Sequence, residues 1–139
     1  MSPKRTIGRT DLSVNPIGLG GMPLSIAGRP DEAQAHAVIK AFVEAGGDFI
    51  DTANVYCLDD ADLGHNEQLI AGALRKLGKQ NAVTVATKGG LRRPRGAWTR
   101  DGRPEWLRAS CEKSLRDLGV ETIALYQLHA IDSKVGLAE

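Results

Sequence analysis

Four short apolar runs rich in β-branched residues recur at near-regular intervals along the chain, at residues 14–19, 48–53, 82–88 and 122–129. Runs of this kind predict β-strands, and each interval between them carries a longer segment with apolar residues at helical spacing. Strands that alternate with such helices lie parallel and are joined by right-handed crossovers. The sequence therefore predicts an α/β fold, either a barrel or a doubly wound sheet.

Each interval has start or stop signals for one amphipathic helix. Asp31 is a predicted N-cap of the first helix, which Gly46 and Gly47 stop. Gly78 ends the second helix, and Pro104 lies near the start of the third. The three apolar stripes comprise Ala35, Val38, Ile39, Phe42 and Val43, then Leu69, Ile70, Ala73, Leu74 and Leu77, then Leu107, Cys111, Ser114, Leu115 and Leu118, which Gly119 follows.

Length and charge narrow the class of protein. The 139 residues suffice for one domain with its own core, so neither disulfides nor metals are needed for stability. The 18 Lys plus Arg residues nearly balance the 17 Asp plus Glu residues. This balance lacks the basic footprint of proteins that bind nucleic acids or anionic membranes, so we expect a small-molecule partner.

The two cysteines, Cys57 and Cys111, form no CxxC motif and no zinc-type spacing with histidine. We interpret them as reduced thiols, with Cys111 on the buried face of the third helix. The N-terminus has no signal-peptide core, and no apolar run approaches the ~18 residues of a membrane span. The sequence therefore predicts a soluble, cytoplasmic protein without a bound metal.

Residues suited to chemistry lie at or just after the carboxyl ends of the later strands: Asp51, Tyr56, Lys88 and His129. Barrel enzymes place their active sites at this end of the strands. A doubly wound nucleotide-binding fold would carry GxGxxG after its first strand, and GLGGMPLS at residues 18–25 lacks that spacing. The sequence thus favours the barrel.

The sequence segments around these residues, FIDTANVY, VATKGG and LYQLHAID, resemble characteristic motifs of the aldo-keto reductase family. HNEQLIAGAL and SLRDLGVETIALYQLH are similar to its second and third helices with the following strand, and RTIGRTDLSVNPIGLGGM to its N-terminal hairpin and first strand. The resemblance covers nearly the whole chain. It implies the first half of a (β/α)8 TIM barrel, with residues 1–13 as a hairpin plug and residues 14–139 as the first four barrel strands.

The resemblance also implies an activity, the reduction of an aldehyde or ketone by hydride from NADPH. The family's catalytic tetrad corresponds to Asp51, Tyr56, Lys88 and His129 in chain order. Taken singly, each has a simpler interpretation: a turn cap, a packing tyrosine, a solvated lysine and a core histidine. The four together favour the tetrad.

Elementary chemistry supports the same roles. A phenol such as Tyr56 can protonate a developing alkoxide, and an ammonium at Lys88 would stabilise the phenolate that remains. Asp51 would fix that ammonium and balance its charge. His129 would orient and polarise the carbonyl, while the hydride must come from a nicotinamide.

Cofactor and substrate contacts are implied for two further segments. Gly20, Gly21 and Met22, together with Asp51, resemble the segment that approaches the cofactor, although an ordinary βα turn explains these glycines equally well. Residues 89–105 resemble the family's substrate loop, with Trp98 as a lid over the carbonyl pocket. A solvated mobile loop is the alternative.

Three features depart from the family pattern. Cys57 stands where the family usually has Gly, and Ala124 where it has Asp. Glu139 comes just where a fourth helix should begin, so only four of eight strands are visible. We therefore expect this chain alone to be inactive, because the family's phosphate pocket lies in the later strands, and to expose sheet edges that favour self-association.

Two alternative functions stay open. One is a noncatalytic half-barrel that acts as a dimer or binding module. The length of the reading frame beyond Glu139 would distinguish it from part of a longer reductase. The other is an unrelated barrel enzyme with Lys88 as a Schiff-base amine, which borohydride trapping would reveal. The sequence does not name the carbonyl substrate.

Overall fold

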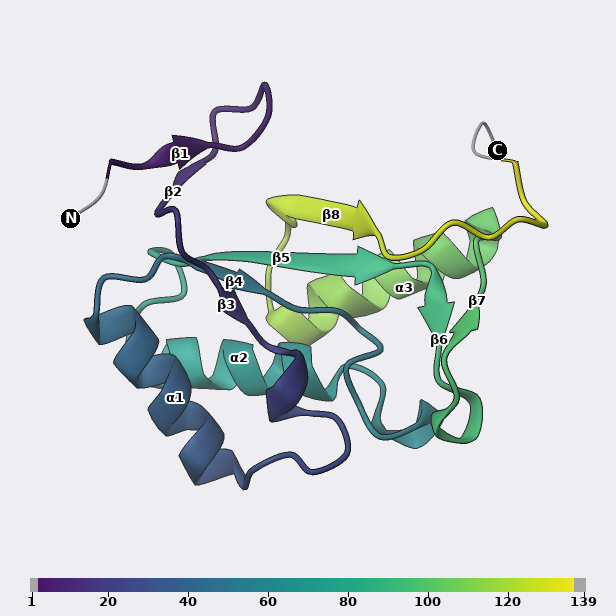
Figure 1. Ribbon diagram of the computed structural model, residues 1–139, viewed down its shortest axis with the longest axis horizontal. Coiled ribbons are helices and arrows are strands. Elements are labelled where there is room, and N and C mark those ends of the chain that lie inside the picture. The colour runs from purple at the N-terminus through teal and green to yellow at the C-terminus, as the bar shows by residue number, and fades with distance from the viewer. Residues whose placement is uncertain (1–2, 137–139) are drawn as a thin grey trace.

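The centre of the molecule is a sheet of parallel strands, drawn in Figure 1. The computed structural model describes residues 3–136. Within them the main sheet has four strands in the order β3-β4-β5-β8, each parallel to its neighbour. The strands are β3 Leu19–Gly20, β4 Phe49–Asp51, β5 Thr84–Gly89 and β8 Leu125–Leu128.

Three α-helices within the described residues connect these strands and lie on one side of the sheet (Figure 1). They are α1 Glu32–Glu44, α2 His65–Lys76 and α3 Pro104–Leu118. The predicted cap of α1 is confirmed, because the Asp31 side chain accepts a hydrogen bond from Gln34 N at 2.8 Å. Pro104 opens α3, and Gly119 ends it in a left-handed conformation with φ 68°.

The hydrophobic core lies between the sheet and the helices. Ile39 of α1, Ile50 of β4 and Ile70 of α2 are each fully buried there. They belong to the predicted strands and stripes, so the helical and strand periods placed most of the core correctly. Two stripe residues are exceptions: Val38 is 40% exposed on α1, and Cys111 is half-buried where the sequence predicted a buried position.

The first predicted strand is wrong in its bounds. Ser13–Val14 forms β2, which pairs antiparallel with β1 Arg5–Thr6, and the barrel strand is reduced to β3. Pro16 lies between them and has no N–H for a sheet ladder, which separates the hairpin from the strand. The predicted hairpin therefore exists and extends to Val14. Met1, Ser2 and Glu139 lie outside the described residues.

The segment predicted as a substrate loop is a folded hairpin. Its strands are β6 Leu91–Arg92 and β7 Thr99–Arg100, joined through the 3-10 turn η3 Pro94–Gly96. In Figure 1 the tip of this hairpin lies beside the short helix η2 Asp60–Asp62. This helix follows the loop that carries Tyr56. Residues 91–100 therefore have regular secondary structure, while the substrate loop and the solvated mobile loop both stay predictions.

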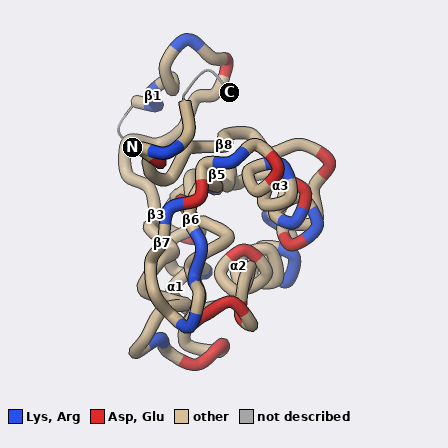
Figure 2. The backbone as a smooth tube through the Cα atoms, turned by 90° about the vertical axis from the view of Figure 1, so that its right-hand side faces the viewer, with Lys and Arg blue, Asp and Glu red and all other residues tan. Residues whose placement is uncertain are grey.

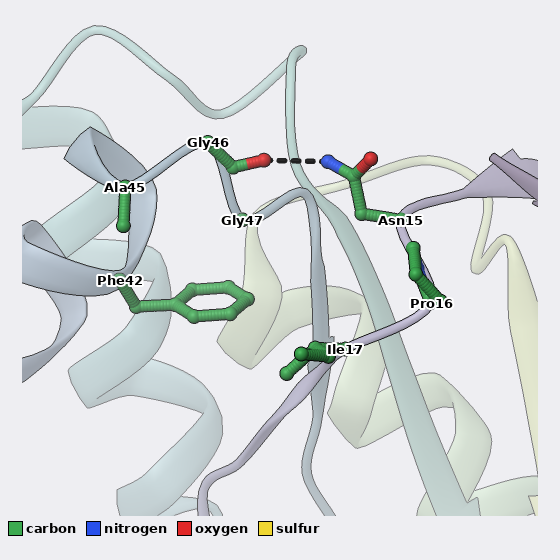
Figure 3. Close-up of a pocket in the computed structure, with 7 residues that line it drawn as sticks. All are labelled: Asn15, Pro16, Ile17, Phe42, Ala45, Gly46 and Gly47. Carbon is green, nitrogen blue, oxygen red and sulfur yellow. Dashed lines mark hydrogen bonds between the residues drawn. The ribbon is translucent and has the colours of Figure 1, made fainter. Parts of the chain in front are cut away.

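A cavity of about 280 Å³ lies where the N-terminal segment meets the end of α1 (Figure 3). Asn15 Nδ2 donates to the Gly46 carbonyl at 2.5 Å, and Ile17 and Phe42 line the cavity. These residues precede β3 and β4. The cavity is thus at the amino ends of the strands, away from the predicted catalytic residues.

Candidate active site

Lys88 is the centre of a hydrogen-bonded group at the carboxyl ends of the strands. It lies on β5, and its side chain is only 13% exposed. Its Nζ donates to Asp51 Oδ2 at 2.6 Å, to Tyr56 Oη at 2.9 Å and to the Thr52 carbonyl at 2.9 Å. An ammonium has three N–H donors, so all of them are used, and the head group is fixed in position.

Asp51, the last residue of β4, is held through both carboxylate oxygens. Oδ2 accepts from Lys88, and Oδ1 accepts from Gln127 Nε2 at 3.1 Å. Gln127 was not among the predicted site residues. It lies two positions before His129, and side chains two apart on a strand share a face, so this alternation was the signal that could have found it.

Tyr56 comes from the loop after β4 and is nearly buried. The loop turns tightly, since Tyr56 N donates to the Ala53 carbonyl at 3.1 Å, and the small side chains of Ala53 and Val55 are fully buried beneath it. This packing directs the phenol toward Lys88. The ammonium also lies 4.7 Å from the centre of the tyrosine ring.

His129 follows β8 and faces Tyr56. The two rings meet edge to face, with centroids 5.5 Å apart and an interplanar angle of 84°. Burial, together with the nearby Lys88 charge, lowers the pKa of His129 below its usual 6.5. Its Nδ1 is buried and has no hydrogen-bond partner within residues 3–136. The imidazole is therefore neutral at pH 7.

Cys57, the departure next to Tyr56, does not prevent the tyrosine from reaching Lys88. Its side chain is fully buried, and its Sγ lies 3.3 Å from the carbonyl oxygens of Val55 and Asp59. Burial raises the pKa of the Cys57 thiol to about 11. The thiol is therefore a packing group of the loop and stays protonated at neutral pH.

The predicted cofactor segment lies at the end of β3, beside Asp51. Gly21 N donates to the Asp51 carbonyl at 2.8 Å, and a Cβ at Gly21 would overlap the Asn66 side chain. Packing inside the protein thus requires this glycine. At Gly20, by contrast, a Cβ would meet nothing within 4 Å, and Met22 is 40% exposed.

Trp98 is placed against Arg93 rather than in the hydrogen-bonded group around Lys88. The Arg93 guanidinium carbon lies 3.8 Å from the centre of the Trp98 ring, which is 47% exposed. Among residues 3–136 no cluster of three or more histidine, cysteine or acidic side chains could hold a metal ion. Nor does any helix in that range have the length and apolar character to cross a membrane.

Comparison with known proteins identifies the fold that carries this arrangement. A model of the aldo/keto reductase family matches residues 16–139. The chain belongs to this family. The predicted family is therefore confirmed, and members of the aldo/keto reductase family characteristically use NADH or NADPH.

Individual relatives agree with the family model. The uncharacterized oxidoreductase YqkF of Bacillus subtilis (strain 168) is 31% identical over 128 residues, which cover 91% of this chain and 38% of that protein. The aldo-keto reductase AKR11C1 from Bacillus halodurans, in its holo form, superposes with a TM-score of 0.82 at 32% identity. The glycerol dehydrogenase AKR11B4 from Gluconobacter oxydans does so with a TM-score of 0.77 at 34% identity.

The overlap is partial on the side of the relatives. The match covers 99% of this chain and 43% of the Bacillus halodurans enzyme, and 95% of this chain and 40% of the Gluconobacter oxydans enzyme. The chain thus spans less than half the length of the relatives that it matches. The predicted fold class is confirmed, because the parallel sheet and its helices correspond to part of an aldo-keto reductase barrel.

Proposed function

We propose that these residues form the catalytic part of an NADPH-dependent enzyme that reduces an aldehyde or ketone to an alcohol, with Tyr56 as the general acid. The observation that supports this most strongly is the Lys88 ammonium, which donates to both Asp51 and Tyr56. Membership of an oxidoreductase family is consistent with it.

Tyr56 can release its proton because of the way its oxygen is used. Oη accepts a hydrogen bond from Lys88, so its own O–H is left to donate to a substrate oxygen. When the proton moves, the resulting phenolate faces an ammonium, and the hydrogen bond becomes charge-assisted and stronger. Asp51 pairs with the Lys88 ammonium, and this ion pair offsets the cost of burying the charge.

His129 suits the role of a neutral hydrogen-bond donor to the same oxygen. A neutral imidazole can donate through one nitrogen and polarise a carbonyl, whereas an imidazolium would compete with Tyr56 as the acid. The edge-to-face contact with Tyr56 holds the ring next to the phenol. The lowered pKa of His129 keeps it in this neutral form at pH 7.

A nicotinamide cofactor would bind at the end of β3. Gly20, where a Cβ would meet nothing within 4 Å, and the exposed Met22 are accessible beside Asp51, and Gly21 lies in the same turn. When bound, the nicotinamide supplies the hydride that no side chain can donate. Trp98 would cover the substrate. For this role its ring must extend past the Arg93 guanidinium, on which it packs, toward the carbonyl pocket.

The two alternatives are less well supported. A Schiff-base lysine must be a free amine, whereas Asp51 and the Thr52 carbonyl both stabilise the ammonium of Lys88. A noncatalytic binding module would have no use for a lysine shared between a carboxylate and a phenol. The binding module would be favoured if a complete barrel that contains these residues bound NADPH but did not reduce a carbonyl substrate.

The experiment is Tyr56→Phe in an eight-stranded barrel that contains these residues, with Tyr126→Phe as the matched control. Tyr126, the other tyrosine of the chain, is half-buried, and its Oη donates to the Leu107 carbonyl at 3.4 Å instead of lying beside Lys88. Loss of a general acid lowers turnover by about 10²-fold or more while cofactor binding stays nearly unchanged. A loss below about tenfold means that another group is the acid.

The 139-residue chain is the second subject of the test. We expect it to bind NADPH weakly and to show no measurable reduction of an aromatic aldehyde, because positioning of the cofactor needs the rest of a barrel. The outer edges of β3 and β8 have no partner strand among the described residues, so self-association is the one route to a closed sheet. Light scattering alongside the assay shows whether the chain is a monomer or has self-associated. If a monomer reduced the aldehyde and Tyr56→Phe abolished this turnover, the expectation would be contradicted.

A further inference from the structure

Arg93 is a buried charge that no described carboxylate neutralises. It follows β6 and is only 5% exposed. The ion pairs of this hairpin are made by its neighbours Arg92 and Arg103, both with Asp101. Within residues 3–136, the Arg93 atoms Nε and Nη1 have no hydrogen-bond partner at all. A buried guanidinium is costly, so its remaining contacts must explain its place in the fold.

Those contacts are with the loop that carries Tyr56. Arg93 Nη2 donates to the Cys57 carbonyl at 3.0 Å and to the Leu58 carbonyl at 3.1 Å, the two residues that directly follow the tyrosine. The Trp98 ring packs against the guanidinium, with its centre 3.8 Å from the guanidinium carbon. The planar head group is therefore fixed by an aromatic ring and by hydrogen bonds to two backbone carbonyls.

The same hairpin touches this loop at a second point. A Cβ placed on Gly96, in the turn η3, would lie 3.2 Å from the Leu58 carbonyl, so the turn approaches the loop backbone closely. Gly96 also has a φ of 83°, which favours glycine. Figure 2 shows basic segments along the β6–β7 hairpin, and of its arginines Arg92, Arg93, Arg95 and Arg100 only Arg93 is buried.

Arg93 is linked to Lys88 through the backbone. Lys88 lies on β5, and the chain passes through Gly89 and Gly90 into β6 and then to Arg93. One short segment therefore carries the lysine that contacts the Tyr56 phenol and the arginine that holds the loop after it. A loop fixed at both points can keep its phenol within hydrogen-bond distance of Lys88.

We propose that Arg93 is a positioning residue for Tyr56, which acts by fixing the Cys57–Leu58 backbone against the β6–β7 hairpin. The inference rests on the proposed function, since it gives Arg93 a role in the geometry of the general acid. Arg93 itself touches neither the phenol nor the other tetrad side chains in the contacts described above. Its effect on catalysis is therefore expected to pass entirely through Tyr56.

The first test is an NMR measurement on the 139-residue chain. The nuclear Overhauser effect between the rings of Tyr56 and His129 reports their edge-to-face contact, and the chain has only two tyrosines and three histidines to assign. We expect Arg93→Met to weaken this cross-peak severalfold while the resonances of α1 to α3 stay unchanged. Arg93→Lys, which keeps a donor for the carbonyls, should restore most of it.

Arg92→Met is the matched control. Arg92 is adjacent, stacks on Trp106 and is 43% exposed in its side chain, so its loss should leave the cross-peak unchanged. A wild-type cross-peak in Arg93→Met, or equal weakening in both variants, would overturn the proposal. So would a lysine variant no better than the methionine variant, or unfolding of the whole chain by Arg93→Met, since Arg93 would then serve general stability.

The second test uses kinetics in a complete barrel that contains these residues. Arg93→Met should lower kcat at least tenfold with little change in the KM for NADPH, and should cause no further loss when Tyr56 is already phenylalanine. If Tyr56→Phe has no effect, the proposed function fails. If Tyr56→Phe abolishes turnover but Arg93→Met does not lower it, only the positioning role fails.

Discussion

The carboxyl group of Glu67 should make the stability of the chain depend on pH in a way that one substitution removes. Glu67 lies on α2 and is fully buried against β5, where the Thr87 hydroxyl donates to Oε1 at 2.6 Å. Oε2 has no hydrogen-bond partner in the described part of the chain. Burial therefore outweighs the hydrogen bond and raises the pKa of Glu67 to about 7.

The magnitude follows from linkage between protonation and folding. The unfolded chain has a Glu67 pKa near the ordinary 4.5, and the folded chain about 7. A raised carboxyl pKa means that the folded state binds the proton more tightly, so the stability that Glu67 contributes is greatest below pH 4.5 and is lost as the pH rises through 7. Each pKa unit corresponds to about 1.4 kcal/mol, so the total loss is about 3 kcal/mol.

The perturbation is Glu67→Gln, which keeps the shape and an acceptor for Thr87 but cannot ionise. In urea unfolding, the free energy of the variant relative to the wild type should rise by about 2.5 kcal/mol between pH 5 and pH 8. Glu121→Gln, at an exposed position, serves as the control and should show no such rise. An equal effect of Glu67→Gln at both pH values would refute the reasoning.

Three further predictions concern stability and titration. Asp31→Ala should reduce the free energy of unfolding by about 1 kcal/mol, and Asp31→Asn by much less, as measured by urea unfolding. Gly47→Ala should cost about 1–3 kcal/mol because the new Cβ would overlap the Phe42 ring, whereas Gly20→Ala, with open space, should change stability by less than about 0.5 kcal/mol. Burial lowers the pKa of His129, so its NMR titration should have a midpoint below 6.5; the stability that the neutral ring contributes is present above pH 6.5 and is lost as the pH falls through the folded-state midpoint.

Periodicity and local signals in the sequence determined the order of the barrel strands and the three α-helices and most of the core. The helical stripes, the Asp31 cap and the stop at Gly119 depend on residues within a few positions of one another, so they can be identified without the fold. Pro16 was a local signal as well, and it marks the break between the hairpin and β3 that the apolar run concealed. The segments around Asp51, Lys88 and His129 are local signals too, and they indicated the family that the comparison confirmed.

The tertiary structure decided which of these residues meet. The partners of Asp51 lie 37 and 76 positions away, at Lys88 and Gln127, and Arg93 lies 36 positions from Cys57. The contact of Asp51 with Lys88 was predicted from the family resemblance, and alternation along the strand places Gln127 on the face of His129. Neither pattern says which strand ends lie side by side, because the parallel sheet brings strand ends together regardless of their separation in the chain. The raised pKa of Glu67 also depends on the tertiary structure. The residue lies on α2, and its carboxyl group is removed from water only when β5 and α3 pack against it.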